Sequence, residues 1–260
     1  MTSDQGRYMS NSYGFGGNEE FKEESSWRYP LAIFFATLIL CAIFLYHYVG
    51  PGVDELQGAS PKPTISDEKI TLVIADRTFK IEANYTVYPR DRNNGEREKV
   101  YLYALWPTMN GYAPPRRDDF VNNAADTRRV DMVIDTRDMQ NFSEQRRLDM
   151  LYLPHVIDKR GIKGDYELTR YVFKEGRPNA PSSGYADKEL YVGSDTDEQI
   201  AVLFCYKVQE SSVVPPDCWR EVEISPRIGL KYYFKRPYLP DWKQIDRDIR
   251  AFVSERMVTG

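Results

Sequence analysis

The longest uninterrupted apolar stretch of the chain runs over residues 31–49 and contains no Asp, Glu, Lys or Arg. At a rise of about 1.5 Å per residue, a helix of this length spans roughly the hydrocarbon core of a bilayer. Aromatic side chains flank the stretch at both ends, as is typical of membrane interfaces: Trp27, Tyr29, Tyr46 and Tyr48. The pattern predicts one transmembrane helix over residues 30–50.

The residues that flank this stretch indicate whether it is cleaved and which way it crosses the membrane. The segment before it is acidic, whereas a cleaved signal peptide has a short basic segment there and a small-residue cleavage site afterwards. We therefore expect an uncleaved signal anchor. Lys22 and Arg28 precede the span, and the first basic residue after it is Lys62, so the positive-inside rule favours a cytoplasmic N-terminus. A buried helix of a soluble core is the alternative, although such a helix would normally show a polar face.

The rest of the chain divides by composition into three parts. Residues 1–29 are rich in Gly, Ser, Asn, Tyr and Glu and nearly lack aliphatic side chains, which predicts a disordered cytoplasmic tail. Residues 51–66 hold Gly, Pro, Ser and Thr and are predicted to be a linker. Residues 67–260 are long enough for one domain with its own core.

Within residues 67–260, short segments rich in Val, Ile, Thr and aromatic residues alternate with turn residues, which predicts a mainly antiparallel sheet. The predicted strands are residues 70–75, 78–88, 99–106, 129–135, 166–174, 189–192, 200–208, 218–224 and 228–235. Asn93-Asn94-Gly95 is typical of a tight hairpin and is predicted to join the second and third of these strands. Ser143 is predicted to cap a short helix that continues to Leu153.

The last segment of the chain has the clearest helical pattern. Asp241 is a good N-cap, and six apolar residues then recur at helical spacing: Trp242, Ile245, Ile249, Phe252, Val253 and Met257. The opposite face is predicted to be solvated and carries charge: Lys243, Asp246, Arg247, Asp248, Arg250 and Glu255. The expected fold is therefore α+β, with one transmembrane helix, an antiparallel β domain and a C-terminal amphipathic helix on its sheet. An interfacial membrane helix is the alternative for this last element.

Two of the three cysteines, Cys205 and Cys218, fall in the domain on neighbouring predicted strands. If the hairpin between these strands is symmetric about Ser211-Ser212, the two cysteines face each other directly and Phe204 faces Trp219. Directly opposed positions can meet disulfide distances, so we expect a bridge and hence an oxidising compartment. Two unpaired buried thiols are the alternative.

Charge and motifs exclude several function classes. The chain has 35 basic and 39 acidic residues and no basic stripe, so nucleic-acid binding is not expected. The domain has a single histidine, His155, on which any Ser-His-Asp or Cys-His catalysis would have to rest. Residues 195–197 resemble the Asp-x-Asp with which some glycosyltransferases hold a metal and a sugar nucleotide, but their surroundings indicate a turn between two strands. We expect neither a cofactor nor a metal.

The segment over residues 105–120 is too long for a plain connection and mixes large apolar residues with paired charges. If exposed, four of its side chains would form a partner-binding surface: Trp106, Met109, Tyr112 and Phe120. A loop that folds over the edge of the core with its aromatic residues buried is the other interpretation.

Four short motifs can be compared with known families: Ile81-Glu-Ala-Asn84, Leu105-Trp-Pro107, Gly111-Tyr112 and the ending Leu239-Pro-Asp-Trp-Lys-Gln-Ile-Asp246. With these motifs the chain resembles a group of uncharacterised single-span membrane proteins from alphaproteobacteria. The resemblance implies an inner-membrane anchor with a periplasmic domain, and it supplies no activity and no site residues.

The sequence therefore favours a membrane-anchored extracytoplasmic binding or scaffolding protein with a protein partner. It is predicted to cross a bacterial inner membrane once, with its N-terminus in the cytoplasm and its domain in the periplasm. Two alternatives remain: a membrane-anchored periplasmic hydrolase or transferase, and a regulatory subunit that signals through its cytoplasmic tail.

Overall fold

The computed structural model describes residues 27–49, 52–137, 143–174, 183–208 and 216–258. The chain forms two compact units, residues 1–52 and residues 53–260, which are described separately. Most of the predicted tail, residues 1–26, lies outside the described residues.

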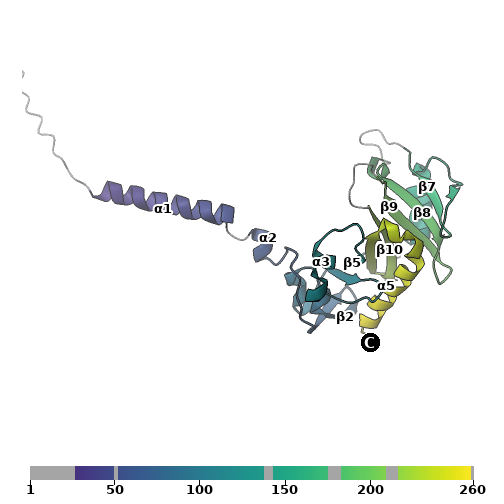
Figure 1. Cartoon of the computed structure of the whole chain (residues 1–260), viewed down its shortest axis with the longest axis horizontal. Coiled ribbons are helices and arrows are strands. Elements are labelled where there is room, and N and C mark those ends of the chain that lie inside the picture. The colour runs from purple at the N-terminus through teal and green to yellow at the C-terminus, as the bar shows by residue number, and fades with distance from the viewer. Residues whose placement is uncertain (1–26, 50–51, 138–142, 175–182, 209–215, 259–260) are drawn as a thin grey trace, which may run out of the picture. The chain divides into compact units, whose positions relative to one another are not determined.

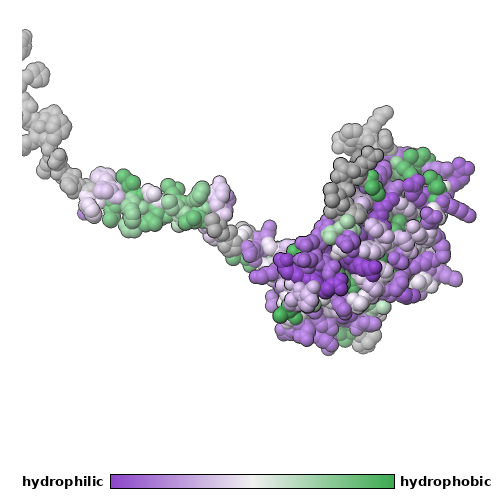
Figure 2. Space-filling view, in the orientation of Figure 1, coloured by the Kyte–Doolittle hydropathy of each residue, from purple (hydrophilic) through white to green (hydrophobic). Residues whose placement is uncertain are grey.

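The first unit contains the helix α1 (Arg28–Val49). Within the described residues it is the one helix that is long and apolar enough to cross a membrane. Figure 2 shows hydrophobic residues along its length, and Pro30 lies in its first turn, where a missing N–H leaves no helical hydrogen bond unmade. Its cysteine, Cys41, is exposed and unpaired in this chain.

The second unit contains two sheets. The small sheet has the strand order β2-β1-β3 and is made of β1 (Lys69–Ile74), β2 (Arg77–Glu82) and β3 (Gly95–Glu96). The large sheet is antiparallel throughout and has the order β4-β5-β11-β10-β9-β8-β7-β6. Its strands are β4 (Lys99–Leu105), β5 (Arg129–Thr136), β6 (Ile162–Lys163), β7 (Thr169–Val172), β8 (Lys188–Ser194), β9 (Ile200–Tyr206), β10 (Asp217–Ser225) and β11 (Ile228–Lys235).

Helices connect and cover these strands. The α-helices of this unit are α2 (Val53–Leu56), α3 (Arg117–Val121), α4 (Glu144–Arg147) and α5 (Trp242–Arg256). The other helical turns are η1 (Ala83–Tyr85), η2 (Pro89–Arg92), η3 (Pro114–Arg116), η4 (Leu148–Tyr152), η5 (Leu153–His155), η6 (Ser183–Tyr185) and η7 (Arg236–Asp241). The mixture of a large antiparallel sheet with helices confirms the α+β class.

The main core lies between the large sheet, the small sheet and α5, which crosses the sheet beside β10 (Figure 1). Alternate residues of β1 point into it, since Ile70, Leu72 and Ile74 are all at 3% exposure or less. Five of the six residues of the predicted apolar stripe are buried on α5: Trp242, Ile245, Ile249, Phe252 and Val253. The sixth, Met257, follows the end of the helix in an extended conformation and is half-buried against the core.

The opposite face of the large sheet carries a second cluster in which aromatic rings stack. The Phe204 ring of β9 lies 5.4 Å from the Trp219 ring of the neighbouring β10 and 6.2 Å from the Phe173 ring just after β7, centre to centre. The turns η4 and η5 cover this face: η4 contributes Leu148 and Tyr152 to the cluster, and η5 contributes Leu153. The predicted cap of the preceding helix is confirmed, because the Ser143 side chain accepts a hydrogen bond from the Arg146 N–H.

The predicted hairpin at Asn93-Asn94-Gly95 is wrong. These residues lead into β3, which pairs in parallel with β1, and Asn94 Oδ1 accepts a hydrogen bond from the Thr71 N–H at 2.8 Å. The chain then leaves the small sheet, so β4 begins the large one. The predicted second strand, residues 78–88, is interrupted by η1. Just after η1, Thr86 forms an isolated bridge with Leu102 of β4.

Most of the predicted linker, residues 53–66, belongs to the second unit and forms hydrogen bonds with it. It contains α2, and the Lys62 N–H donates to the Val87 carbonyl at 3.1 Å. The Arg90 N–H in turn donates to the Gly58 carbonyl at 3.2 Å. These contacts hold residues 58–62 on the surface formed by η2 and the segment before it.

Candidate functional site

The loop over residues 105–120 folds over the core edge, as in the second of the two interpretations. Trp106 is 7% exposed and donates its indole N–H to Asp248 of α5 at 3.0 Å. Phe120 is 4% exposed and packs against Tyr103 and Tyr112. Met109 and Tyr112 are half-buried. The four side chains therefore do not form an exposed aromatic patch, because Trp106 and Phe120 face the interior.

The disulfide between Cys205 and Cys218 is present, with an S–S distance of 2.00 Å. The predicted register is confirmed, because Cys205 pairs with Cys218 and Phe204 with Trp219 across β9 and β10. Both cysteines are fully buried. On the chain-entropy model, a bridge that closes a loop of this length stabilises the fold by about 3 kcal/mol.

A buried ionic cluster joins α4, β10 and α5. Arg220 is 1% exposed and contacts three carboxylates at 2.8–3.1 Å, those of Glu144, Asp195 and Asp246. Arg250 adds a second positive charge at 3.0 Å from Asp195. Burial raises the pKa of Glu144 although Arg220 opposes this. Burial also acts to raise the pKa of Asp195, but the hydrogen bonds and charge of Arg220 together with the N–H groups of Gln199 and Asp197 outweigh it, so the pKa of Asp195 is lowered.

The buried ionic cluster corrects the predicted position of Asp246. Asp246 was placed on the solvated face of the last helix, but its side chain is fully buried and accepts a hydrogen bond from Tyr232 at 2.7 Å. The predicted turn at residues 195–197 is confirmed, since Asp195 Oδ1 accepts the N–H groups of Asp197 and Gln199. The carboxylates here are bound by arginines, and none of the described residues form a group of three or more His, Cys, Asp or Glu that could hold a metal.

The main candidate site is a cavity of about 500 Å³ at the β6 end of the large sheet. The β6–β7 hairpin, Tyr191 of β8 and the turn η7 form its walls. Its lining combines three basic groups with apolar and aromatic ones: Ile162, Lys163, Gly164, Asp165, Tyr166, Leu168, Arg170, Tyr191, Arg236, Pro237, Leu239 and Pro240. A concave, partly apolar surface with a few convergent polar groups is typical of a ligand-binding site.

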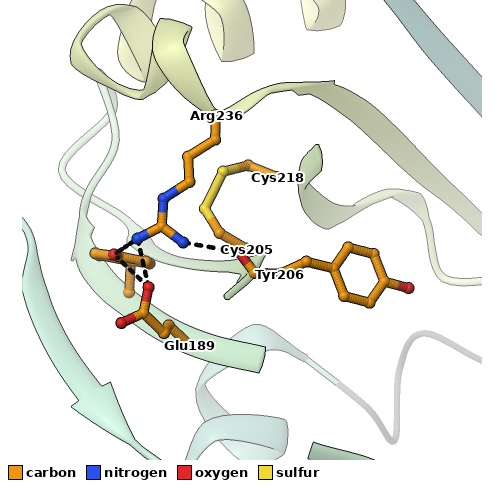
Figure 3. Close-up of a disulfide and its surroundings, with 6 residues drawn as sticks. Glu189, Cys205, Tyr206, Cys218 and Arg236 are labelled. Carbon is orange, nitrogen blue, oxygen red and sulfur yellow. Dashed lines mark hydrogen bonds and ion pairs between the residues drawn. A yellow bond between two sulfur atoms is a disulfide. The ribbon is translucent and has the colours of Figure 1, made fainter. Parts of the chain in front are cut away.

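Glu189 organises the basic side of the cavity. Its carboxylate pairs with Arg170 at 2.9 Å and with Arg236, and it also accepts a hydrogen bond from the Tyr191 hydroxyl at 3.1 Å. Arg236 donates in addition to the Tyr206 carbonyl at 2.7 Å, next to the disulfide (Figure 3). The Tyr206 carbonyl and the Glu189 carboxylate therefore fix the position of the Arg236 guanidinium from two sides.

The rim of the cavity has an unusual backbone. Tyr166 and Glu167 are consecutive non-glycine residues with φ of +61°, a region that costs energy for residues with side chains. Helix α5 holds this turn in place, because the Trp242 indole N–H donates to the Tyr166 carbonyl at 3.1 Å and Lys243 pairs with Glu167. Strained turns that are held in this way occur preferentially at binding and catalytic sites.

The ion pairs of Glu189 make the stability of this site depend on pH. Burial opposes ionisation, but Arg236, Tyr191 and Arg170 outweigh it, so the pKa of Glu189 lies below its ordinary value of 4.5. The charge of Glu189 therefore stabilises the folded state above about pH 4.5, and this contribution is lost as the pH falls through the lowered pKa.

We expect Glu189→Gln to lower the free energy of unfolding at pH 7 and the difference from the wild type to shrink below pH 4.5. Urea unfolding at pH 7, 4 and 3 measures this. Glu223→Gln is the control, because Glu223 is exposed and has no ion pair within the described residues; its effect should stay within about 0.5 kcal/mol. An equal loss for Glu189→Gln at all three pH values would contradict the assignment.

The comparisons with known proteins bear on the fold. No protein-family model matches the chain, and no curated protein matches it. Among solved structures, an immunity protein of the Stenotrophomonas maltophilia type IV secretion system aligns with a TM-score of 0.51 and 18% identity, over 75% of this chain and 95% of that one. The Neisseria meningitidis iron-regulated outer membrane lipoprotein FrpD aligns with a TM-score of 0.46 and 12% identity, over 76% and 96%. The second unit thus shares the fold of the immunity protein.

Proposed function

We propose that this protein is a membrane-anchored binding protein whose second unit lies outside the cytoplasm and recognises a protein partner through the cavity at the β6 end of the large sheet. The observation that carries the proposal is this cavity, in which Arg236 is held by the Glu189 carboxylate and by the Tyr206 carbonyl. The carboxylates of the buried ionic cluster are bound by arginines, so the geometry favours binding over the hydrolase or transferase alternative.

The proposed location is a bacterial inner membrane, with the N-terminus in the cytoplasm and the second unit in the periplasm. The apolar helix α1 supports the anchor, and the disulfide supports an oxidising compartment. The basic residues before α1 and the lack of any between its end and Lys62 support the direction.

A test of topology and binding in living cells uses the full-length chain. An alkaline phosphatase fused after Gly260 should be active, and peptide mapping without reductant should find Cys205 and Cys218 linked. A photo-crosslinking amino acid at Ile162, 55% exposed at the cavity, should give a discrete protein adduct. The same amino acid at Ile65, 69% exposed and outside the cavity, is the matched control and should give none. An inactive fusion, or equal adducts at both positions, would contradict the proposal.

An immunity role is a second candidate, favoured by the shared fold with the immunity protein of the Stenotrophomonas maltophilia secretion system. On this proposal the binding partner is a protein delivered by a neighbouring cell. Deletion of the gene should then reduce survival in mixed culture with sister cells that carry an active secretion system. Equal survival with and without the gene would leave the general binding function and remove the immunity role.

A further inference from the structure

Strands β9 and β10 separate before either of them ends. Their last residue pair is Leu203 with Arg220, although β9 has three more residues at this end (200–202) and β10 has five more (221–225). A cavity of about 200 Å³ lies beside the split, and its lining comes from both strands, from the start of α4 and from α5. The main-chain groups just beyond the last pair therefore need other partners.

Side chains of α4 take the place of the next main-chain hydrogen bond. On the register of the paired residues, Val202 would be opposite Glu221, and the N–H of the first would donate to the carbonyl of the second. Instead, the Val202 N–H donates to Glu144 Oε1 at 2.8 Å. The Glu221 carbonyl accepts a hydrogen bond from Arg147 Nη2 at 2.6 Å. Both ends of a possible bond between the strands are thus held by one short helix.

Both of these contacts can be broken without leaving a buried charge unpaired. Without Glu144, Arg220 keeps two fully buried aspartates as partners. Without Arg147, the Glu221 carboxylate keeps its ion pair with Arg137. Burial raises the pKa of Glu144 although Arg220 opposes this, so the ionised side chain is more favourable in water than in its place beside the sheet.

The segment that carries the two side chains is short and irregular. It consists of α4, η4 and η5, which have four, five and three residues. Leu148 is buried against the sheet, and the Tyr152 ring packs against Phe204 at 4.8 Å between ring centres. By contrast, Met150 and Leu151 are 62% and 40% exposed. Short helical turns that depend on a few buried side chains are typical of elements that open locally.

We propose that residues 144–155 form a strap that leaves the large sheet as a unit, and that β9 and β10 then extend their pairing as far as Ile200 and Glu223. The Val202 N–H and the Glu221 carbonyl exchange their side-chain partners for each other, which offsets the loss of the strap. Opening uncovers the aromatic cluster on this face of the sheet. The inference does not depend on the cavity at the β6 end, so its failure would leave the proposed function in place.

The first test traps the extended pairing with a disulfide in the full-length protein in detergent micelles, with Cys41→Ala as the background. Ile200 and Glu223 line the cavity from the two strands, and the extended register brings them opposite each other. Ile200→Cys with Glu223→Cys should cross-link in oxidised glutathione, and Arg147→Ala should raise the rate by about tenfold because it removes a charged hydrogen bond of the strap. Gln199→Cys with Glu223→Cys is the matched control. It lines the same cavity out of register, so Arg147→Ala should not accelerate its cross-linking.

The second test follows hydrogen exchange of the Val202 amide by NMR in protein with isotope-labelled valine. In Glu144→Ala this amide loses its side-chain acceptor, and it should remain protected because the Glu221 carbonyl replaces that acceptor. Arg146→Ala changes an exposed neighbouring arginine and should alter neither exchange nor cross-linking. Rapid exchange of Val202 in Glu144→Ala, equal cross-linking of the two cysteine pairs, or no effect of Arg147→Ala would overturn the inference.

Discussion

Replacement of Arg220 by alanine is expected to lower the free energy of unfolding of the second unit by about 3–5 kcal/mol, because it removes the positive charge shared by three buried carboxylates. Arg220 is 1% exposed, and its partners Asp195 and Asp246 are fully buried in their side chains. Once the guanidinium is lost, these acids must either stay charged without a partner or take up protons. Urea unfolding of the full-length protein, followed by tryptophan fluorescence, measures the loss.

Arg227→Ala is the matched control for this change. Arg227 is exposed, lies in the turn between β10 and β11, and has no ion pair within the described residues. Its replacement should cost less than about 0.5 kcal/mol. A loss below about 1 kcal/mol for Arg220→Ala would mean that the buried cluster does not hold α4 and α5 on the sheet.

Phe252→Ala is expected to cost about 3–5 kcal/mol, because it removes buried area and leaves a cavity in the main core. The ring is 4% exposed and packs edge-on against Tyr85 at 4.9 Å between ring centres. The Arg256 guanidinium lies 3.8 Å from its centre and adds a cation–π contact. The same urea unfolding measures the change.

Arg247→Ala on the same helix is the control, since its side chain is 58% exposed and its one ion pair among the described residues is with Asp248, at 3.6 Å. We expect a cost below about 0.5 kcal/mol. If both substitutions proved equally mild while Phe252→Ala abolished liposome or partner binding, the apolar stripe of α5 would be a docking surface instead of core.

The sequence by itself determined the elements whose signals are local. The apolar run of α1 needs no partner to be recognised, because its length and lack of charge suffice. The stripe of α5 follows from the helical period, and Trp242 through Val253 are buried where that period places them. Cys205 and Cys218 were predicted to be opposite each other from the number of residues on either side of one hairpin, and the register of β9 and β10 confirms this.

Tertiary structure decided everything that depends on which distant segments meet. Asn94 and Gly95 have the composition of a hairpin turn, but β3 pairs in parallel with β1 and the next strand, β4, belongs to the large sheet. Trp106 is buried because Asp248, which is 142 residues away in sequence, accepts its N–H. Contacts between segments so far apart in sequence cannot be predicted from a short stretch of residues.

The charged residues show the same division most clearly. Asp246 and Arg250 have the spacing of a solvated helix face, yet one is fully buried and the other is bound to Asp195 of a neighbouring turn. The basic wall of the cavity likewise brings Arg170 and Arg236, from β7 and η7, onto Glu189 of β8. Period and composition predict where a side chain points. Whether water or an opposite charge meets it there depends on the packing of distant elements, because the free energy of a buried charge is set by its partners.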